Sequence, residues 1–216
     1  MKAMQRIGAL IGAMAILAGG DAQAQSKTTY NGPRRVLIIR HAEKTGEKND
    51  VHLSKQGVDR AAVLFRLFEP ANDRPDPFPV PDFIFAASNS TNSQRPLQTV
   101  EPLAVKFNLP IDRSYQSKRS SAMSKIVADG KPPTSEGMFG LRDEIFGKPK
   151  YVGKTILMSW RHSSIPELAR TLGAKDAPTT WDADSFDRVW QITFDQQGRA
   201  AFLDRPQNLL PGDARE

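Results

Sequence analysis

Two short apolar runs, each ending in an arginine and a histidine, constrain this chain more than any other feature. Residues 36–39 read Val-Leu-Ile-Ile and lead into Arg40-His41, and residues 156–160 read Ile-Leu-Met-Ser-Trp and lead into Arg161-His162. Runs of this kind are typical of buried strands, and sites in open α/β sheets form just beyond the carboxyl ends of strands. The pattern predicts a reactive pair at one sheet edge. For one run alone, an ordinary strand end with solvated polar residues is the competing interpretation.

The rest of the chain shows strand and helix periodicities in alternation. Further strands are expected at 83–87 and, as an edge hairpin, at 188–194 and 200–203. Helices are expected from Ser54 to the residue before Pro70, from Pro96 to Phe107 with a kink or restart at Pro102, and over 121–128, 138–146 and 163–172. The alternation predicts a three-layer α/β/α sandwich with a mostly parallel central sheet.

Several apolar side chains are expected to pack in the core rather than to serve a site. Those of the first expected helix are Val58, Ala61, Ala62, Phe65 and Phe68, and those near the C-terminal hairpin are Trp181, Phe186 and Trp190. His52, just before that helix, is expected at the surface or as a capping residue.

The first 24 residues have the pattern of a secretory signal peptide. Lys2 and Arg6 precede an apolar run at 7–18, and Ala22-Gln23-Ala24 is a small-x-small cleavage pattern. A membrane anchor is the alternative, but the run is shorter than the roughly 20 residues that a spanning helix needs. We expect cleavage after Ala24, a flexible lead-in over 25–33, and an exported, periplasmic or extracellular protein without a stable membrane anchor.

Composition narrows the classes of partner and cofactor. The formal net charge of +6 favours anionic ligands, but no long Lys/Arg cluster or aromatic-basic interleaving is present, so nucleic-acid binding is not expected. With three histidines and no cysteine, a dedicated transition-metal site is not expected either. The sequence contains no Walker A, Gly-x-Gly-x-x-Gly or Gly-x-Ser-x-Gly motif. We therefore expect no cofactor.

A third motif, Arg95-Pro96-Leu97-Gln98-Thr99, lies between the two runs. Pro96 favours a helix start, which places Arg95 at a helix N-terminus suited to an anion. Taken in order, Arg40-His41-Ala42, this middle motif and His162 resemble the histidine phosphatase superfamily, and the chain is similar to an exported bacterial member. The resemblance covers roughly 34–205. It implies a phosphoglycerate mutase-like fold and one histidine phosphatase-like domain over 34–216.

The resemblance implies a metal-independent phosphomonoesterase. His41 would be the nucleophile that forms a phosphohistidine, Arg40 and Arg95 would bind the phosphoryl group, and His162 would donate a hydrogen bond to it. Guanidinium forks suit this role because they bind phosphate bidentately and stay charged. The substrate would be a phosphorylated small molecule or a phosphoprotein. A catalytically weak or inactive member that binds a phosphorylated ligand is the alternative, and a mutase is a minor one. The motifs do not specify the oligomeric state.

The general acid is the part that the motifs leave open. In some branches of the family an acidic residue directly follows the second histidine, but here Ser163 holds that position. In other branches it is a Glu between the middle motif and the late strand, and Glu136, in a Gly-bearing loop, is the leading candidate. Asp129, Asp143 and Glu144 remain open, the last two on an expected helix where salt bridges are the simpler role.

Three further residues beside the motifs have two interpretations each. Arg161 is expected either to contact phosphate directly, or to be solvated or lie behind the residues that do so. Glu43 and Lys44 are expected either to line the pocket or to lie on a surface loop.

Overall fold

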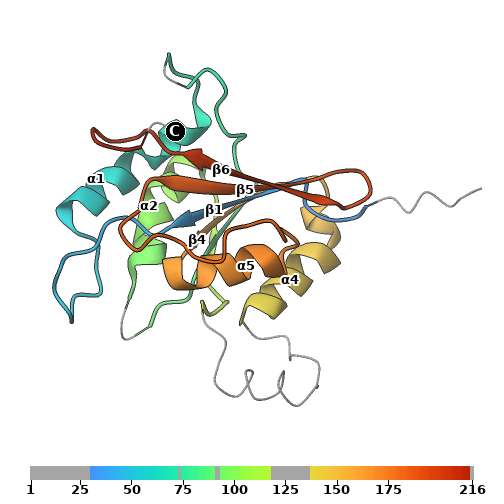
Figure 1. Ribbon diagram of the computed structural model, residues 1–216, viewed down its shortest axis with the longest axis horizontal. Helices are drawn as coiled ribbons and strands as arrows, with labels where there is room; N and C mark the ends of the chain where they lie inside the picture. Colours follow the sequence, from blue (N-terminus) through green and yellow to red (C-terminus); the bar gives the residue numbers. More distant parts are fainter. Residues whose placement is uncertain (1–29, 73, 91–92, 118–136, 215–216) are drawn as a thin grey trace, which may run out of the picture.

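A six-stranded sheet with helices on both faces organises the residues that the computed structural model describes, which are 30–72, 74–90, 93–117 and 137–214 (Figure 1). Its strands are β1 (Arg35–Arg40), β2 (Phe83–Ala86), β3 (Ile111–Asp112), β4 (Thr155–Trp160), β5 (Arg188–Phe194) and β6 (Ala200–Pro206). The order is β3-β2-β4-β1-β5-β6, parallel up to β1 and antiparallel in the last two pairings. The predicted α/β class, the mostly parallel sheet and the edge hairpin are confirmed.

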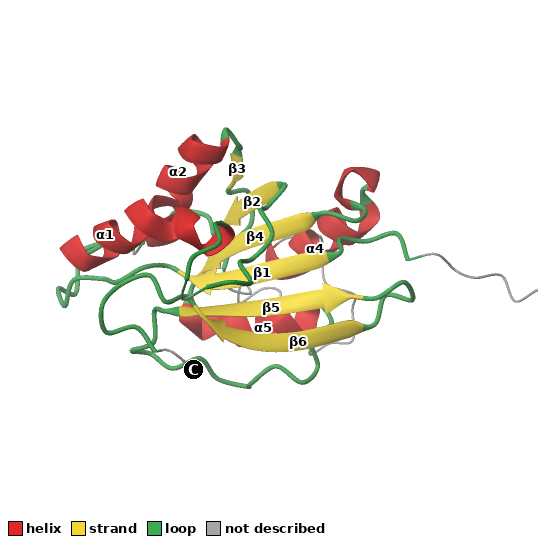
Figure 2. Ribbon diagram, turned by 90° about the horizontal axis from the view of Figure 1, so that it is seen from above, coloured by secondary structure: helices red, strands yellow, loops and turns green. Residues whose placement is uncertain are grey.

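Both faces of β1 are buried, which explains its unbroken apolar sequence. Val36 and Ile38 point into one core cluster, Leu37 and Ile39 into the other, and all four are at most 1% exposed. The helices that cover the faces are α1 (Lys55–Val63), α2 (Arg95–Phe107), α4 (Gly137–Gly147) and α5 (Ile165–Thr171). Figure 2 shows α1 and α2 on one side of the sheet and α4 and α5 on the other. Strands covered on both faces read as continuous apolar runs.

The first expected helix is present but presents a different face to the core. It consists of α1, which Ser54 caps by accepting the N–H of Gly57, followed by the 3₁₀ turn η1 (Leu64–Phe68). Val58 is 55% exposed and Ala62 is exposed, so their predicted core positions are wrong. The buried stripe instead includes Arg60, whose guanidinium is paired inside the molecule.

Helix α2 runs without interruption through Pro102, so the predicted restart there is wrong. It ends where Asn108 adopts a left-handed conformation with φ of 51°, just before Pro110. Strand β3 was not expected from the sequence, because its two residues are too few to show a periodicity. Two other short 3₁₀ turns are η2 (Pro149–Tyr151) and η3 (His162–Ser164).

Helix α4 confirms the helix expected at 138–146, and Trp181 and Trp190 confirm their predicted packing in the core. The predicted signal peptide, most of the lead-in and the predicted helix 121–128 lie outside the described residues. Among the helices that are described, none combines the length and apolar character needed to cross a bilayer.

Candidate active site

The carboxyl ends of β1 and β4 meet at one edge of the sheet. Arg40 lies opposite Trp160 in the register, and the backbone N–H of His41 donates to the carbonyl of Trp160 at 2.9 Å. Beyond these ends is a pocket of about 150 Å³, lined by Arg40, His41, Lys44, Ser93, Arg95, Arg161, His162 and Ser163. The fold therefore brings together the four site residues predicted most directly from the motifs. Four of the lining side chains are cationic, and none of these lining residues is a carboxylate.

His41 is buried, at 5% exposure, and its ring is oriented by the backbone. Its Nδ1 lies 2.8 Å from the carbonyl oxygen of Ala42. A carbonyl can only accept, so Nδ1 carries the hydrogen and Nε2 keeps its lone pair. Burial lowers the pKa of His41 to about 3, against the hydrogen bond to Ala42, and the charges of Arg40 and Arg95 lower it further. The imidazole is therefore neutral over the physiological pH range.

His162 opens η3 directly after Arg161. Burial lowers the pKa of His162 below its usual value, and the neighbouring cations Arg40 and Lys44 act in the same direction. Its Nδ1 is buried and has no hydrogen-bond partner among the described residues. The pocket thus holds a second histidine that favours the neutral form.

Arg40 is 1% exposed and is held by an irregular segment far along the chain. Its Nη1 donates to the carbonyls of Asp182, Ala183 and Ser185, and its guanidinium carbon lies 3.6 Å from the ring centre of Phe186. Nε and Nη2 are buried without a hydrogen-bond partner among the described residues. Burial lowers the pKa of Arg40 to about 10, so it is still charged at neutral pH. One side of the guanidinium group is therefore anchored, and the described residues leave its Nε and Nη2 donors without a partner.

Phe186 packs beside the site, although it does not line the pocket. It is only half-buried and lies over Arg40, with its ring centre 6.2 Å from that of His41. It is therefore a packing residue, as predicted, but it packs against a guanidinium group of the site rather than inside the apolar core. No periodic pattern marks the segment that includes it, so sequence reasoning had no signal for this contact.

Arg95 and Arg161 are two further cations that line the pocket. Nη1 of Arg95 donates to the carbonyl of Asp50 at 2.7 Å, and Nη2 of Arg161 donates to the hydroxyl of Ser90. Burial lowers the pKa of both guanidinium groups, and the charge of Arg95 lowers that of Arg161 further. An anion between them would relieve this repulsion. Of the two interpretations of Arg161, the structure favours the pocket wall, and Lys44 also lines the pocket.

Thr99 and Gln98 of the middle motif have a structural role, because they hydrogen-bond to the loop after β1. Thr99, 1% exposed, accepts the N–H of Ala42 and donates to the carbonyl of Arg95, both at 2.8 Å. Gln98 accepts the N–H of Leu53 at 3.1 Å, and its amide nitrogen lies 2.7 Å from Nδ1 of His52. These contacts tie the start of α2 to the loop that follows β1. His52 is exposed and does not line the pocket.

Glu43 does not line the pocket but joins a buried ion-pair network. Arg60, 3% exposed, donates to both carboxylate oxygens of Glu43 at 2.7–3.1 Å and to both of Asp213 at 2.7 and 2.9 Å. Burial by itself lowers the pKa of Arg60, but the hydrogen bonds that it donates to Asp213 and Glu43 raise the pKa above its usual value overall. A Cβ on Gly57 would lie 2.3 Å from the carbonyl oxygen of Glu43, so α1 approaches this loop closely. The loop after His41 is thereby anchored to α1 and to the C-terminal segment.

The candidate general acids lie away from this pocket or outside the described residues. Asp143 is paired with Arg142, and Glu144 is paired with Lys150 at 3.0 Å and accepts the hydroxyl of Tyr151. Both thus have the salt-bridge role that their helix position favoured. Glu136 and Asp129 lie outside the described residues. Within the described part of the chain, no three His, Asp or Glu side chains cluster closely enough to hold a metal ion.

Comparison with known proteins supports the fold. No known protein family profile matches the sequence, and no curated protein matches it. Among solved structures, the protein histidine phosphatase SixA complexed with tungstate has a TM-score of 0.51 at 14% identity, covering 80% of this chain and 97% of that one. A phosphoglycerate mutase from Bacillus anthracis str. Sterne has a TM-score of 0.49 at 13% identity, covering 81% and 93%. The first match confirms the phosphoglycerate mutase-like fold, and at such low identity it shows the fold alone.

Proposed function

We propose that this chain is a metal-independent phosphomonoesterase that works through a phosphohistidine on His41. The observation that carries the proposal is a buried, neutral imidazole in a small pocket lined by the guanidinium groups of Arg40, Arg95 and Arg161. A phosphoryl group in transfer spreads negative charge over three equatorial oxygens, so it needs a cage of donors around a nucleophile. The resemblance of the motifs to the histidine phosphatase superfamily supports the same reaction.

The proposed mechanism has two steps. Nε2 of His41 attacks phosphorus with its lone pair, the bond from phosphorus to the ester oxygen breaks, and the leaving alkoxide takes a proton from the general acid, for which Glu136 is proposed below. Water then attacks the phosphohistidine, gives a proton back to the carboxylate of that acid, and releases inorganic phosphate and the free imidazole. The carbonyl of Ala42 accepts from Nδ1 throughout, so it orients the ring and stabilises the positive charge on it. Arg40, Arg95 and His162 stabilise the transferring oxygens.

A second candidate function is binding of a phosphorylated ligand without turnover. The observation that favours it is the lack of a carboxylate among the described residues that line the pocket, because an alkoxide leaving group needs a general acid. The two candidates differ in whether a phosphoenzyme forms.

Turnover of para-nitrophenyl phosphate by the mature protein separates these candidates. We expect hydrolysis that survives a strong chelator and is lost in His41→Ala. The control is Arg199→Ala, which removes an exposed side chain outside the pocket. Acid quenching during turnover should trap phosphate on the wild type and not on His41→Ala. Saturable phosphate binding with no hydrolysis would support the second candidate, and equal rates in wild type and His41→Ala would refute the first.

We propose Glu136 as the general acid, on its place in the sequence between the middle motif and β4. Glu136→Gln should then slow alkyl phosphates strongly and spare aryl phosphates, whose leaving groups need no proton. Asp143→Asn, on the exposed side of α4, is the control. A shallow dependence of rate on leaving-group pKa that persists in Glu136→Gln would exclude Glu136 and direct the search to Asp129.

We also propose that the protein is exported. The proposal rests on the charged, apolar and small-x-small segments of residues 1–24. N-terminal sequencing of the periplasmic or secreted fraction should begin at Gln25. Full-length protein confined to the cytoplasm would contradict it.

A further inference from the structure

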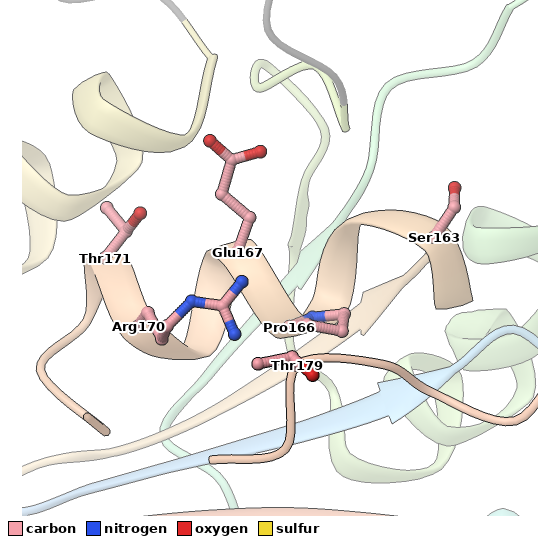
Figure 3. A pocket seen from close by; sticks show the side chains of 6 residues that line it. All are labelled: Ser163, Pro166, Glu167, Arg170, Thr171 and Thr179. Carbon is pink, nitrogen blue, oxygen red and sulfur yellow. The ribbon is translucent and has the colours of Figure 1, made fainter. Parts of the chain in front are cut away.

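A second hollow adjoins the phosphoryl pocket along helix α5. It measures about 520 Å³ and is lined by Ser163, Pro166, Glu167, Arg170, Thr171 and Thr179 (Figure 3). Ser163 lines both this groove and the phosphoryl pocket, so the two are adjacent. The groove has the size of a small-ligand site. The pocket beyond β1 and β4, at about 150 Å³, is much smaller, so most of an ester's leaving group must lie outside it.

The groove is built from one polar face that runs from η3 along α5. Its five residues from Ser163 to Thr171 are spaced by three and four positions, the spacing of one helix face. Ile165, Leu168 and Ala169, on the opposite face, are fully buried, so the helix cannot turn its polar face elsewhere. In the view of Figure 3, Ser163 and Glu167 extend from the helix in a common direction.

Thr179 belongs to the segment that follows α5 and forms the second wall. This wall is tied to the helix, because Nη1 of Arg170 donates to the carbonyl of Pro178 at 3.4 Å. Figure 3 shows the chain at Thr179 passing beside α5. The two walls of the groove thus contact each other at Arg170. The exposed side chains of Ser163 and Arg170 show that the groove is open to solvent.

The two hollows differ in charge. The phosphoryl pocket carries Arg40, Lys44, Arg95 and Arg161, whereas the groove carries one carboxylate and one guanidinium, whose formal charges cancel. Three hydroxyl groups complete the groove, and a hydroxyl both donates and accepts hydrogen bonds. A second phosphate would face Glu167 here, without the excess of cations that the phosphoryl pocket offers. A neutral group with several hydroxyls matches the mixed donors and acceptors better.

We propose that this groove is the leaving-group subsite and that it binds a neutral, polyhydroxylated alcohol. The substrates would then be sugar or polyol monophosphates, with the phosphoryl group beside His41 and the sugar along α5. Carboxylate and guanidinium groups can each bind two neighbouring hydroxyls. This inference rests on the proposed phosphomonoesterase activity.

The test compares substrates within each variant. The measured quantity is kcat/KM for the best of several hexose and pentose monophosphates, divided by kcat/KM for para-nitrophenyl phosphate. We expect this ratio to fall about tenfold in Glu167→Gln, Arg170→Gln and Thr179→Val, because each removes a hydrogen-bonding group that the sugar would contact and para-nitrophenyl phosphate would not. Arg142→Gln is the matched control, since Arg142 is exposed on α4 and lines neither hollow, and its ratio should equal that of the wild type.

The wild type should also prefer sugar monophosphates to phosphoserine and to fructose bisphosphate. An unchanged ratio in all three well-folded groove variants, or a wild-type preference for phosphoserine or the bisphosphate, would overturn the inference. Thermal unfolding of each variant checks that it is folded, and three independent positions guard against one failed variant. Hydrolysis of para-nitrophenyl phosphate without sugar phosphate turnover would overturn the subsite alone. No His41-dependent hydrolysis of any ester would overturn the proposed function itself.

Discussion

The ring of His41 and the carbonyl of Ala42, its neighbour in the chain, are joined by a 2.8 Å contact that decides which ring nitrogen carries the hydrogen. Because the ring is also buried between cations, protonation of Nε2 is disfavoured and the pKa falls to about 3. The nucleophile and the folded state therefore respond to pH in ways that an exposed histidine would not.

The acid limb of the rate profile should follow the substrate rather than His41. His41 stays unprotonated well below pH 6, whereas a phosphate monoester takes up a proton near a pKa of about 6. We expect the inflection in kcat/KM to move when two esters with different second pKa values are compared. An inflection near the ordinary histidine pKa that is the same for both esters would contradict the neutral nucleophile.

The depressed pKa of His41 should also appear in stability. Between pH 3 and 6.5 the unfolded chain binds a proton at this position and the folded chain does not, so the free energy of unfolding falls as the pH is lowered. The slope from one such group is up to about 1.4 kcal/mol per pH unit. Urea unfolding from pH 4 to 6 should show a shallower slope for His41→Asn than for wild type. His52→Asn is the control, and equal slopes for all three proteins would count against the shift.

Arg40→Lys keeps the positive charge at this position but should still lower the rate of the proposed reaction strongly. Lysine is a point charge that cannot both hold the carbonyls of Ala183 and Ser185 and present a fork to phosphate. Loss of one preorganised donor typically costs about 10²–10³ in rate, and we expect kcat to fall at least that far. The matched control is Arg199→Lys, at an exposed ion pair with Asp195. A kcat within threefold of wild type (roughly the noise of such comparisons) would show that the fork is not used.

Asp213→Asn tests the buried ion-pair network that anchors the loop after His41. Removing this charge leaves Arg60 with an incomplete set of buried acceptors, and breaking a buried ion pair typically costs about 3–5 kcal/mol. Asp59→Asn is the control, since it breaks the exposed pair with Lys55 and should cost under about 1 kcal/mol. The free energies of unfolding from urea titrations give both values. Equal losses in the two variants would show that the buried network adds no particular stability.

The parts of the site that could be predicted are those attached to regular structure. Strands β1 and β4 are buried on both faces, so each leaves an apolar run that ends in a visible Arg-His pair. Their parallel pairing then brings His41 and His162 into one pocket. Ser54 was also predictable, because an N-cap is a local signal.

What could not be predicted depends on contacts between distant irregular segments. Arg40 is anchored by backbone carbonyls near Ala183. Every residue has a backbone carbonyl, so the sequence does not show which ones will accept from Arg40. Arg60 lies on the buried face of α1, where helical periodicity predicts apolar residues. It can be buried there because the carboxylates of Glu43 and Asp213 neutralise its charge. Asp213 shows no pattern that distinguishes it from any other acidic residue near a terminus.

The central position of β1 and β4 in the sheet has a consequence for synthesis. The two strands are direct neighbours in space, yet β2 and α2 lie between them in the chain, and Asp213 follows all of these elements. A nascent chain that has emerged only as far as α2 carries Arg40, His41 and Arg95 but neither Arg161 nor His162. Long-range pairings of this kind form late. If the chain is exported before it folds, as proposed above, His41 would meet His162 only after export, and the assembled pocket would never face phosphate esters of the cytoplasm.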